Sequence, residues 1–217
     1  MYLLTGTRPV PVYTMTHLSQ FNSSPLTLHL TAAKQVQIYL QRTKDRHLFY
    51  PSNNQLKMTA YMDGSCSNCL DTRQSICSYI FQLGNNTISW RSCKEWSVAT
   101  STCEAEYMAL AMMTKHHLWL KLGTQELLKK DIPTALFWGS NGAIDVAYNP
   151  TLNNWLNHID GAYHLTHEQI DQGTVSVMHV VLEENLADIC TKGMMRSVND
   201  HICSKIFGSK WERVLKI

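Results

Sequence analysis

The stretch that decides the fold is residues 75–91, which read SICSYIFQLGNNTISWR. Both halves are short and rich in aromatic and branched side chains, a composition typical of β-strands. The Gly-Asn-Asn sequence at 84–86 between them supplies residues that favour a tight hairpin turn. The stretch therefore predicts two strands, at 75–83 and 86–91, joined as an antiparallel hairpin.

A third strand precedes this hairpin, and an alternating series of helices and strands follows it. Residues 57–63 (KMTAYMD) have the composition of a strand. Ser101 or Thr102 then caps a helical pattern that extends to about residue 130, and Gly123 is a position where this helix could break. The later elements are expected at 134–138 (strand), Asn141 to Tyr148 (helix), 159–172 (helix), 174–181 (strand) and 184–192 (helix). This order predicts an α/β fold with a mixed five-stranded sheet, three antiparallel strands followed by two parallel ones, flanked by helices.

The N-terminal part of the chain has a different pattern. Apolar residues recur at helical spacing in 12–22 and 28–42, with Pro25 between the two segments. The polar sequence PSNNQ that follows is typical of a linker. We therefore expect a short helical appendage at 1–50, a main domain at 57–193 and a helical C-terminal tail at 194–217.

The charge balance allows a nucleic-acid partner without arguing for one. The formal net charge is +2 and the isoelectric point is about 8.1, well short of a strong basic excess. With 44% hydrophobic and 17% charged residues, the chain has the composition of a globular protein and not of a disordered one.

The cysteines and the N-terminus indicate a reduced protein inside the cell, in the cytoplasm or the nucleus. There are seven cysteines, an odd number, and neither a secretory signal nor a long apolar run that would span a membrane. Cys66 and Cys69 form a C-x-x-C pair, but no second pair stands at zinc-finger distance. His164 and His167 are only two residues of a metal shell. We therefore expect no metal or redox role for these four residues and no secretion.

Three carboxylates stand at positions where this order of elements could bring them together. Asp63 ends the first strand, Glu106 lies in the first turns of the long helix, and Asp188 lies in the last helix of the domain. An isolated acidic residue is most often a solvated surface group. The three acids become candidates for a site only through the sequence around them.

That surrounding sequence resembles a known family. Residues 61–65 (YMDGS) resemble the Y-T-D-G-S strand of ribonuclease H enzymes. Further strings occur in the order found in the ribonuclease H domain of copia-type retrotransposon Pol polyproteins: DTRQS (71–75), LGNNTISW (83–90), STCEAEYMAL (101–110), HID (158–160), YH (163–164) and NLADICTK (185–192). At the front, YLLTGTRP (2–9) and the H-x-x-A-x-K-x-V-x-x-Y-L pattern (29–40) resemble the segment that joins reverse transcriptase to ribonuclease H. The polymerase palm with its paired aspartates has no counterpart, so we expect no reverse transcriptase activity.

The resemblance implies a chemistry and a set of residues for it. Ribonuclease H enzymes hydrolyse the RNA strand of an RNA–DNA hybrid with two Mg²⁺ ions roughly 4 Å apart, held by carboxylates. The family uses four carboxylates, and Asp63, Glu106 and Asp188 match three of them. By this resemblance the three would be catalytic residues and metal ligands, with Asp63 bridging the two ions.

The fourth position departs from the family. The pattern L-Y-C-D-N-Q-S-A-I is LFWGSNGAI at 136–144, so Gly139 stands where a metal-ligating aspartate is expected. Glycine has no side-chain oxygen, and loss of one anionic ligand should impair metal binding and catalysis. Several positions that are usually basic are also neutral or weakly basic, which reduces contacts to phosphate: Gln35, Asn157, Ala162 and His167.

Two functions from different classes follow. The first is a degenerate ribonuclease H-like domain with little or no catalysis, which binds an RNA–DNA hybrid or another nucleic acid weakly. The alternative is an active Mg²⁺-dependent endonuclease acting on RNA–DNA hybrids. A third interpretation, a decaying element copy without a selected role, differs from the first in history and not in chemistry.

Overall fold

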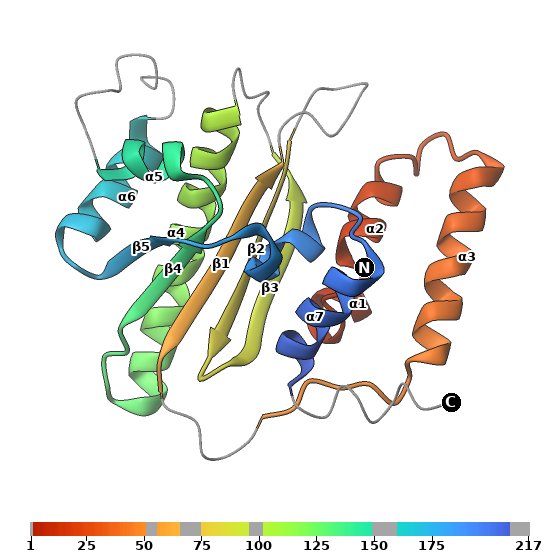
Figure 1. The fold of residues 1–217 in the computed structure, drawn as a ribbon, viewed down its shortest axis with the longest axis horizontal. Coiled ribbons are helices and arrows are strands. Elements are labelled where there is room, and N and C mark those ends of the chain that lie inside the picture. The colour runs from red at the N-terminus through yellow and green to blue at the C-terminus, as the bar shows by residue number, and fades with distance from the viewer. Residues whose placement is uncertain (1, 51–55, 66–74, 96–101, 149–159, 209–217) are drawn as a thin grey trace.

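The computed structural model of the protein describes residues 2–50, 56–65, 75–95, 102–148 and 160–208. These residues form a five-stranded sheet with the order β3-β2-β1-β4-β5 (Figure 1). β2 is antiparallel to both β1 and β3, whereas β4 pairs parallel with β1 and β5 pairs parallel with β4. The predicted mixed sheet is confirmed, with strands β1 (Met58–Ser65), β2 (Ile76–Leu83), β3 (Asn86–Lys94), β4 (Thr134–Trp138) and β5 (Val175–His179).

The helices lie on both faces of this sheet and beyond its β3 edge (Figure 1). α4 is the longest of the described helices and contacts β1 and β2 on one face, together with α5 and α6 near β4 and β5. Their bounds are α1 (Tyr2–Thr7), α2 (Val12–Ser19), α3 (Thr27–Arg42), α4 (Thr102–Leu128), α5 (Asn141–Tyr148), α6 (Asp160–Asp171) and α7 (Arg196–Phe207).

The hairpin turn between β2 and β3 forms where the sequence predicted it. Gly84 and Asn85 have φ angles of 57° and 67°, in the left-handed region that glycine and asparagine tolerate best. Leu83 then pairs with Asn86, which closes the hairpin. The turn chemistry thus sets the register of the two strands, apart from an irregularity between Phe81 and Gln82.

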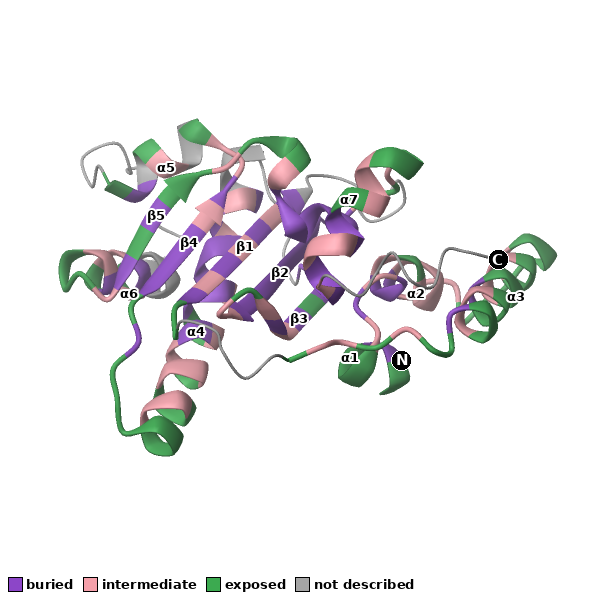
Figure 2. Ribbon diagram, turned by 60° about the horizontal axis from the view of Figure 1, so that its bottom comes forward, coloured by how far each residue is buried: buried purple, intermediate pink, exposed green. Residues whose placement is uncertain are grey.

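Side-chain alternation along the strands divides the core into two clusters. Figure 2 shows that the central strands are buried over much of their length. Met58, Ala60 and Met62 of β1 are buried in a cluster that contains Tyr107 and Leu110 of α4. The intervening positions face the other side of the sheet, as a two-residue period requires. There Ile80 and Trp90 pack in a second cluster with Leu4, Val12, Leu186, Ile189, Ile202 and Ile206.

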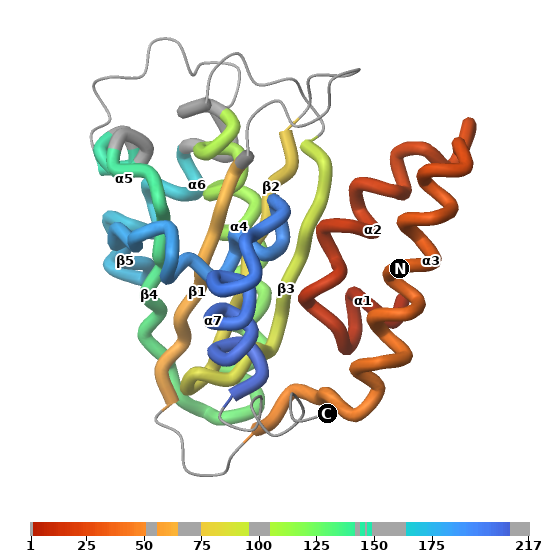
Figure 3. Tube along the Cα trace, turned by 45° about the vertical axis from the view of Figure 1, so that its right-hand side comes forward, coloured from red at the N-terminus to blue at the C-terminus, as the bar shows by residue number. Residues whose placement is uncertain are grey.

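The N-terminal helices stand beside the β3 edge (Figure 3). α1, which the sequence did not predict, buries Leu4 against the second core cluster. The indole nitrogen of Trp90 donates a hydrogen bond of 2.8 Å to the Leu4 carbonyl oxygen. Val36 is the buried residue of α3, whose remaining surface is largely exposed. The helical appendage is therefore attached to the sheet mainly through α1 and α2.

One prediction of local structure is wrong, and one alternative that the sequence left open is settled. The segment 184–192 is not an α-helix but contains two short 3-10 helices, η3 (Leu182–Glu184) and η4 (Leu186–Cys190). Asn185 between them has extended backbone angles, and its side chain accepts a hydrogen bond from the Ala187 N–H, which starts a new turn. The long helix also continues through Gly123 without a break, because a single glycine costs only about 1 kcal/mol inside a helix.

Other predictions fall on residues that the structure leaves undescribed. These are the linker at 51–55, the capping residue Ser101, the Cys66–Cys69 pair and the last part of the C-terminal tail, 209–217. The described part of that tail contains α7 (Arg196–Phe207).

Candidate active site

Asp63 lies near the end of β1, on the face of the sheet that carries η4. Its Oδ2 atom accepts a hydrogen bond from the Thr191 hydroxyl. The Lys192 ammonium lies 3.9 Å from the same oxygen. The side chain of Asp63 is 14% exposed, so it is accessible from solvent at one end of the central strand.

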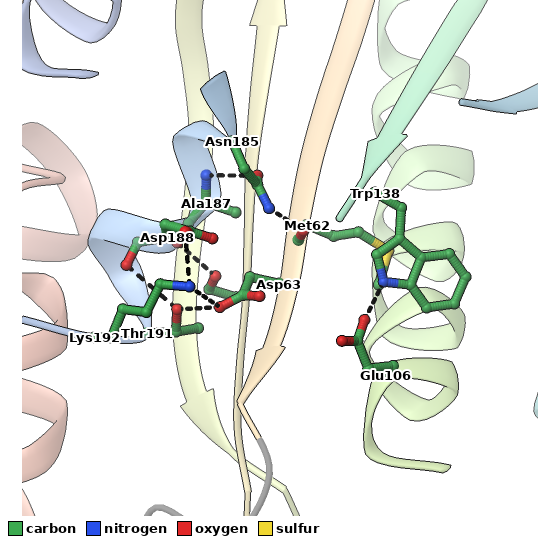
Figure 4. A network of polar contacts seen from close by, with 10 residues as sticks. Met62, Asp63, Glu106, Trp138, Asn185, Ala187, Asp188, Thr191 and Lys192 are labelled. Carbon is green, nitrogen blue, oxygen red and sulfur yellow. Dashed lines mark hydrogen bonds and ion pairs between the residues drawn. The ribbon is translucent and has the colours of Figure 1, made fainter. Parts of the chain in front are cut away.

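Asp188 is brought to the same place by η4. Its side chain is 2% exposed, and its Oδ2 atom lies 2.7 Å from the Lys192 ammonium. Its Oδ1 atom is buried without a hydrogen-bond partner among the described residues. Burial raises the pKa of Asp188 to about 6, the negative charge of Asp63 adds to the rise, and Lys192 opposes it. Figure 4 shows the ammonium between the two carboxylates.

Glu106 approaches from α4 on the other face of β1 and points toward Trp138 (Figure 4). The indole N–H of Trp138, at the end of β4, donates a hydrogen bond to Glu106 Oε2. Burial raises the pKa of Glu106 to about 7, against the lowering effect of that hydrogen bond. The charges of Asp63 and Asp188 also raise this pKa, whereas that of Lys192 lowers it.

A glycine beside Asp63 allows this approach of α4. A Cβ atom at Gly64 would lie 3.0 Å from Glu106 Cα and 3.2 Å from the Ala105 carbonyl oxygen. Real Cβ contacts are rarely so short, so a side chain at this position would push the first turns of α4 away from β1. Gly64 therefore positions Glu106 next to the strand that carries Asp63.

Asn185 holds the segment that carries Asp188 against the central strand. Its side chain is fully buried, and Nδ2 donates a hydrogen bond of 2.9 Å to the Met62 carbonyl oxygen. Ser78 of β2 donates a second bond of 2.9 Å to the Ala187 carbonyl oxygen. These two bonds tie η4 to β1 and β2 on either side of its first turn.

Gly139 is the residue directly after β4, and it lies next to the Asn185 side chain. An added Cβ would meet Asn185 Nδ2 at 3.7 Å, Leu182 Cδ2 at 3.9 Å and the Val180 carbonyl oxygen at 4.0 Å. These are ordinary van der Waals distances, and Gly139 is not among the residues with positive φ. The backbone and the surroundings would therefore admit an aspartate whose side chain begins next to Asn185.

The structure thus places Asp63 and Asp188 around the Lys192 ammonium, whereas Glu106 is hydrogen-bonded to the Trp138 indole. Four further members of this group were not predicted from the sequence: Trp138, Asn185, Thr191 and Lys192. Thr191 and Lys192 are the T-K of the NLADICTK string and Asn185 is its first residue, so the string already contained the signal. Trp138 stands where the family pattern has cysteine, a departure that could have drawn attention to it.

Among the described residues, no group of three or more histidine, cysteine, aspartate or glutamate side chains is arranged to hold a metal ion. His164 and His167 lie on α6, where His164 is exposed. The described helices also include none that is long and apolar enough to cross a membrane.

A mixed sheet in this order, with acids on its central strand, on the next helix and on the turn after β5, defines a ribonuclease H-like domain. Comparison with known proteins adds the family. The chain is 33% identical over 204 residues to the retrovirus-related Pol polyprotein from transposon RE1 of Arabidopsis thaliana, and 31% identical over 208 residues to that from transposon TNT 1-94 of Nicotiana tabacum. The matches cover 94% and 96% of this chain. The chain belongs to this family of copia-type, retrovirus-related Pol polyproteins.

The chain spans only 14% and 16% of the length of these two relatives. A 125-residue portion is also 38% identical to secreted RxLR effector protein 161 of Plasmopara viticola, covering 58% of this chain and 88% of that protein. The shared sequence thus occurs both within long Pol polyproteins and in a protein little longer than the match. No protein-family model matches the chain.

Solved structures with similar folds include ribonucleases H. LC11-RNase H1 in complex with an RNA/DNA hybrid is 19% identical with a TM-score of 0.45, over 62% of this chain and 94% of that one. RNase H1 from Halobacterium salinarum is 14% identical with a TM-score of 0.46, over 62% and 94%. The fold is defined by the strand order β3-β2-β1-β4-β5 and by the similarity to the Pol polyproteins.

Proposed function

We propose that this ribonuclease H-like domain has little or no hydrolytic activity of its own and binds nucleic acid weakly. The observation that carries the proposal is Gly139, which puts no carboxylate directly after β4, at the position next to Asn185. The other features of the site point the same way.

The family chemistry needs a pair of Mg²⁺ ions, which supply a nucleophilic water and neutralise charge on the scissile phosphate. Mg²⁺ demands near-octahedral oxygen ligands at about 2.0–2.1 Å. The donor set of this chain does not fit such a pair. Lys192 already forms an ion pair with Asp188 and lies 3.9 Å from Asp63, and Trp138 donates a hydrogen bond to an oxygen of Glu106. The free Oδ1 of Asp188 leaves room for at most one weakly held cation, and only if Lys192 moves.

The three acids would then serve a different purpose from catalysis. In the absence of a metal pair, Asp63 and Asp188 form an ion-pair group that fixes η4 to the sheet through Lys192 and Thr191. The assignment of Asp63, Glu106 and Asp188 as catalytic residues and metal ligands remains a prediction, and we propose that they are retained as a structural remnant.

Nucleic-acid binding is proposed to be weak because the charge of the chain offers few phosphate contacts. The net charge is only +2. Each neutralised phosphate contributes to affinity and to its salt dependence. We expect an RNA–DNA hybrid to bind at low salt and to dissociate at physiological salt. We place this activity inside the cell, in the cytoplasm or the nucleus.

Cleavage of a labelled RNA–DNA hybrid in Mg²⁺ tests the proposal. The wild type, Gly139→Asp and the double variant Trp138→Cys/Gly139→Asp would be assayed together, with Mg²⁺ and Mn²⁺ binding followed by calorimetry. We expect negligible cleavage and weak binding for the wild type. The double variant should gain the most, because it restores a carboxylate and also releases Glu106 from the indole.

An Asp63→Asn change in each background is the control. Activity gained by the double variant should disappear when Asp63 is changed, which assigns it to this site. Robust wild-type cleavage that Asp63→Asn abolishes would overturn the proposal and establish the alternative, an active endonuclease.

A further inference from the structure

Two cysteines face each other across the β2–β3 hairpin, away from the acidic group. Cys77 and Cys93 are directly paired in the antiparallel register, and their Sγ atoms are 3.6 Å apart. Directly opposed residues of antiparallel strands have Cα atoms about 4.5–5.5 Å apart. That spacing lies inside the range of about 4.4–6.8 Å found for disulfides. The backbone therefore permits a bond between these sulfurs after side-chain rotation alone.

The two thiols differ in access to solvent. Cys77 is 2% exposed and packs in the core cluster under α4. Cys93 is only partly buried, near the end of β3. Met112 of α4 lies against both, with its Sδ 3.2 Å from Cys93 Sγ and 3.7 Å from Cys77 Sγ. A reagent from solvent therefore reaches Cys93 first, and Cys77 is held behind it.

The charges around the pair favour the same order. Arg91 is two residues before Cys93 and therefore on the same face of β3. The hydrogen bond with Cys77 and the nearby Arg91 guanidinium lower the pKa of the Cys93 thiol, although burial opposes this. The hydrogen bond with Cys93, together with burial, raises the pKa of Cys77. Since the thiolate is the nucleophile, Cys93 is the thiol prepared to attack.

We propose that Cys77 and Cys93 form a reversible dithiol–disulfide pair that reacts with low-molecular-weight disulfides, with Cys93 as the attacking thiol and Cys77 as the resolving thiol. The Cys93 thiolate attacks one sulfur of the small disulfide, whose S–S bond breaks and releases one small thiol. Cys77 then loses its proton and attacks the Cys93 sulfur, which expels the second small thiol. The protein loses two hydrogens and two electrons, and the small disulfide becomes two thiols.

This pair resembles redox-sensing cysteines in its physical arrangement. Such cysteines are partly accessible, have a lowered pKa and stand next to a resolving cysteine. The proposal does not depend on the acidic group or on any hydrolytic activity. Cys190 has no part in this chemistry. Its side chain is fully buried, and this burial raises the pKa of its thiol to about 12.

Peptide mapping by mass spectrometry tests the proposal. The folded chain would be incubated with oxidised glutathione, quenched in acid, alkylated and digested, and its fold checked by circular dichroism. We expect a Cys77–Cys93 cross-linked peptide in the wild type that dithiothreitol removes. In Cys93→Ala, Cys77 should carry only the alkylating reagent and no glutathione. In Cys77→Ala, a stable glutathione adduct should accumulate on Cys93. Cys203→Ala, a buried cysteine outside the pair, should cross-link like the wild type.

The wild-type result needs no variant, so a variant that fails to fold does not remove the test. Folded wild-type chain in which Cys77 and Cys93 both remain alkylated, or in which either one links to another cysteine instead, would overturn the pairing. A glutathione adduct that accumulates on Cys77 in the Cys93→Ala variant would overturn the order of attack.

Discussion

The side-chain nitrogen of Asn185 lies 2.9 Å from the carbonyl oxygen of Met62, in a fully buried position between η4 and β1. The same side chain accepts a bond from the Ala187 N–H. One amide thus joins the central strand to the turn that carries Asp188, and several properties of the site depend on this attachment.

Asn185→Ala should destabilise the protein by about 2–3 kcal/mol, because it leaves a buried carbonyl and a buried N–H without partners. Urea unfolding followed by circular dichroism measures the loss. Asn22→Ala, at an exposed position, is the matched control and should change the free energy of unfolding little. Equal effects of the two changes would show that Asn185 does not hold η4 in place.

Gly64→Ala should destabilise the protein by about 1–3 kcal/mol, because the added Cβ would press on the backbone of α4 at 3.0 Å. Gly123→Ala is the converse control inside the same helix, where an added Cβ meets nothing within 4 Å. It should stabilise the protein by up to about 1 kcal/mol through helix propensity. Thermal unfolding of both variants measures the two opposite shifts, and a neutral Gly64→Ala would contradict the close approach of α4.

Lys192→Met should destabilise the protein more at about pH 8 than at about pH 5. The pKa of Asp188 is already raised to about 6 from 3.8, and loss of the ammonium should raise it further. When the pKa of a carboxyl group is higher in the folded state than in the unfolded state, the free energy of unfolding falls as the pH rises from the unfolded-state pKa to the folded-state pKa. Because Lys192 is 41% exposed and solvent screens the pair, we expect only about 1–2 kcal/mol at the higher pH.

Lys192→Arg keeps the positive charge and is the control for that change. Denaturant midpoints across the pH range measure both variants. A loss of stability in Lys192→Met that is equal at both pH values would show that side-chain packing, and not charge, accounts for it.

Glu106 should make the stability of the wild type fall as the pH rises from about 4.5 to about 7. Its folded pKa of about 7 lies above the usual 4.5, so the folded state holds a proton that the unfolded state has released. Glu106→Gln keeps an acceptor for Trp138 but does not titrate. The wild type should therefore lose about 1–3 kcal/mol relative to this variant over the range, measured by unfolding at each pH. Parallel stability curves would rule out the raised pKa.

Much of the fold could be predicted from local patterns. Aromatic and branched residues identified the strands, and the residues at 84–86 identified the hairpin, because turn chemistry and side-chain alternation act over a few neighbours. The turns after β5 were mistaken for a helix, since the apolar spacing of 184–192 does not reveal that the Asn185 side chain would bond to the sheet. A long-range hydrogen bond of this kind leaves no local periodicity.

The acids of the site could be named from their motifs, but their partners could not. Asp63, Glu106 and Asp188 were recognisable from the surrounding strings. Their pairing with Lys192 and Trp138 depends on how three separate elements pack, which spacing along the chain does not encode. Gly139 was recognisable as a departure from the family pattern. That it also has room for a larger side chain required the structure.

The hydrogen bond from Trp90 to Leu4 links the first turn of the chain to a strand of the ribonuclease H-like sheet. If the first fifty residues were cut away, the indole would lose its acceptor, and the apolar surface around Ile80 would be laid open to water. A shortened protein that begins at the first strand would then expose apolar side chains beside the β3 edge. In this chain the N-terminal helices therefore shield the apolar surface beside β3.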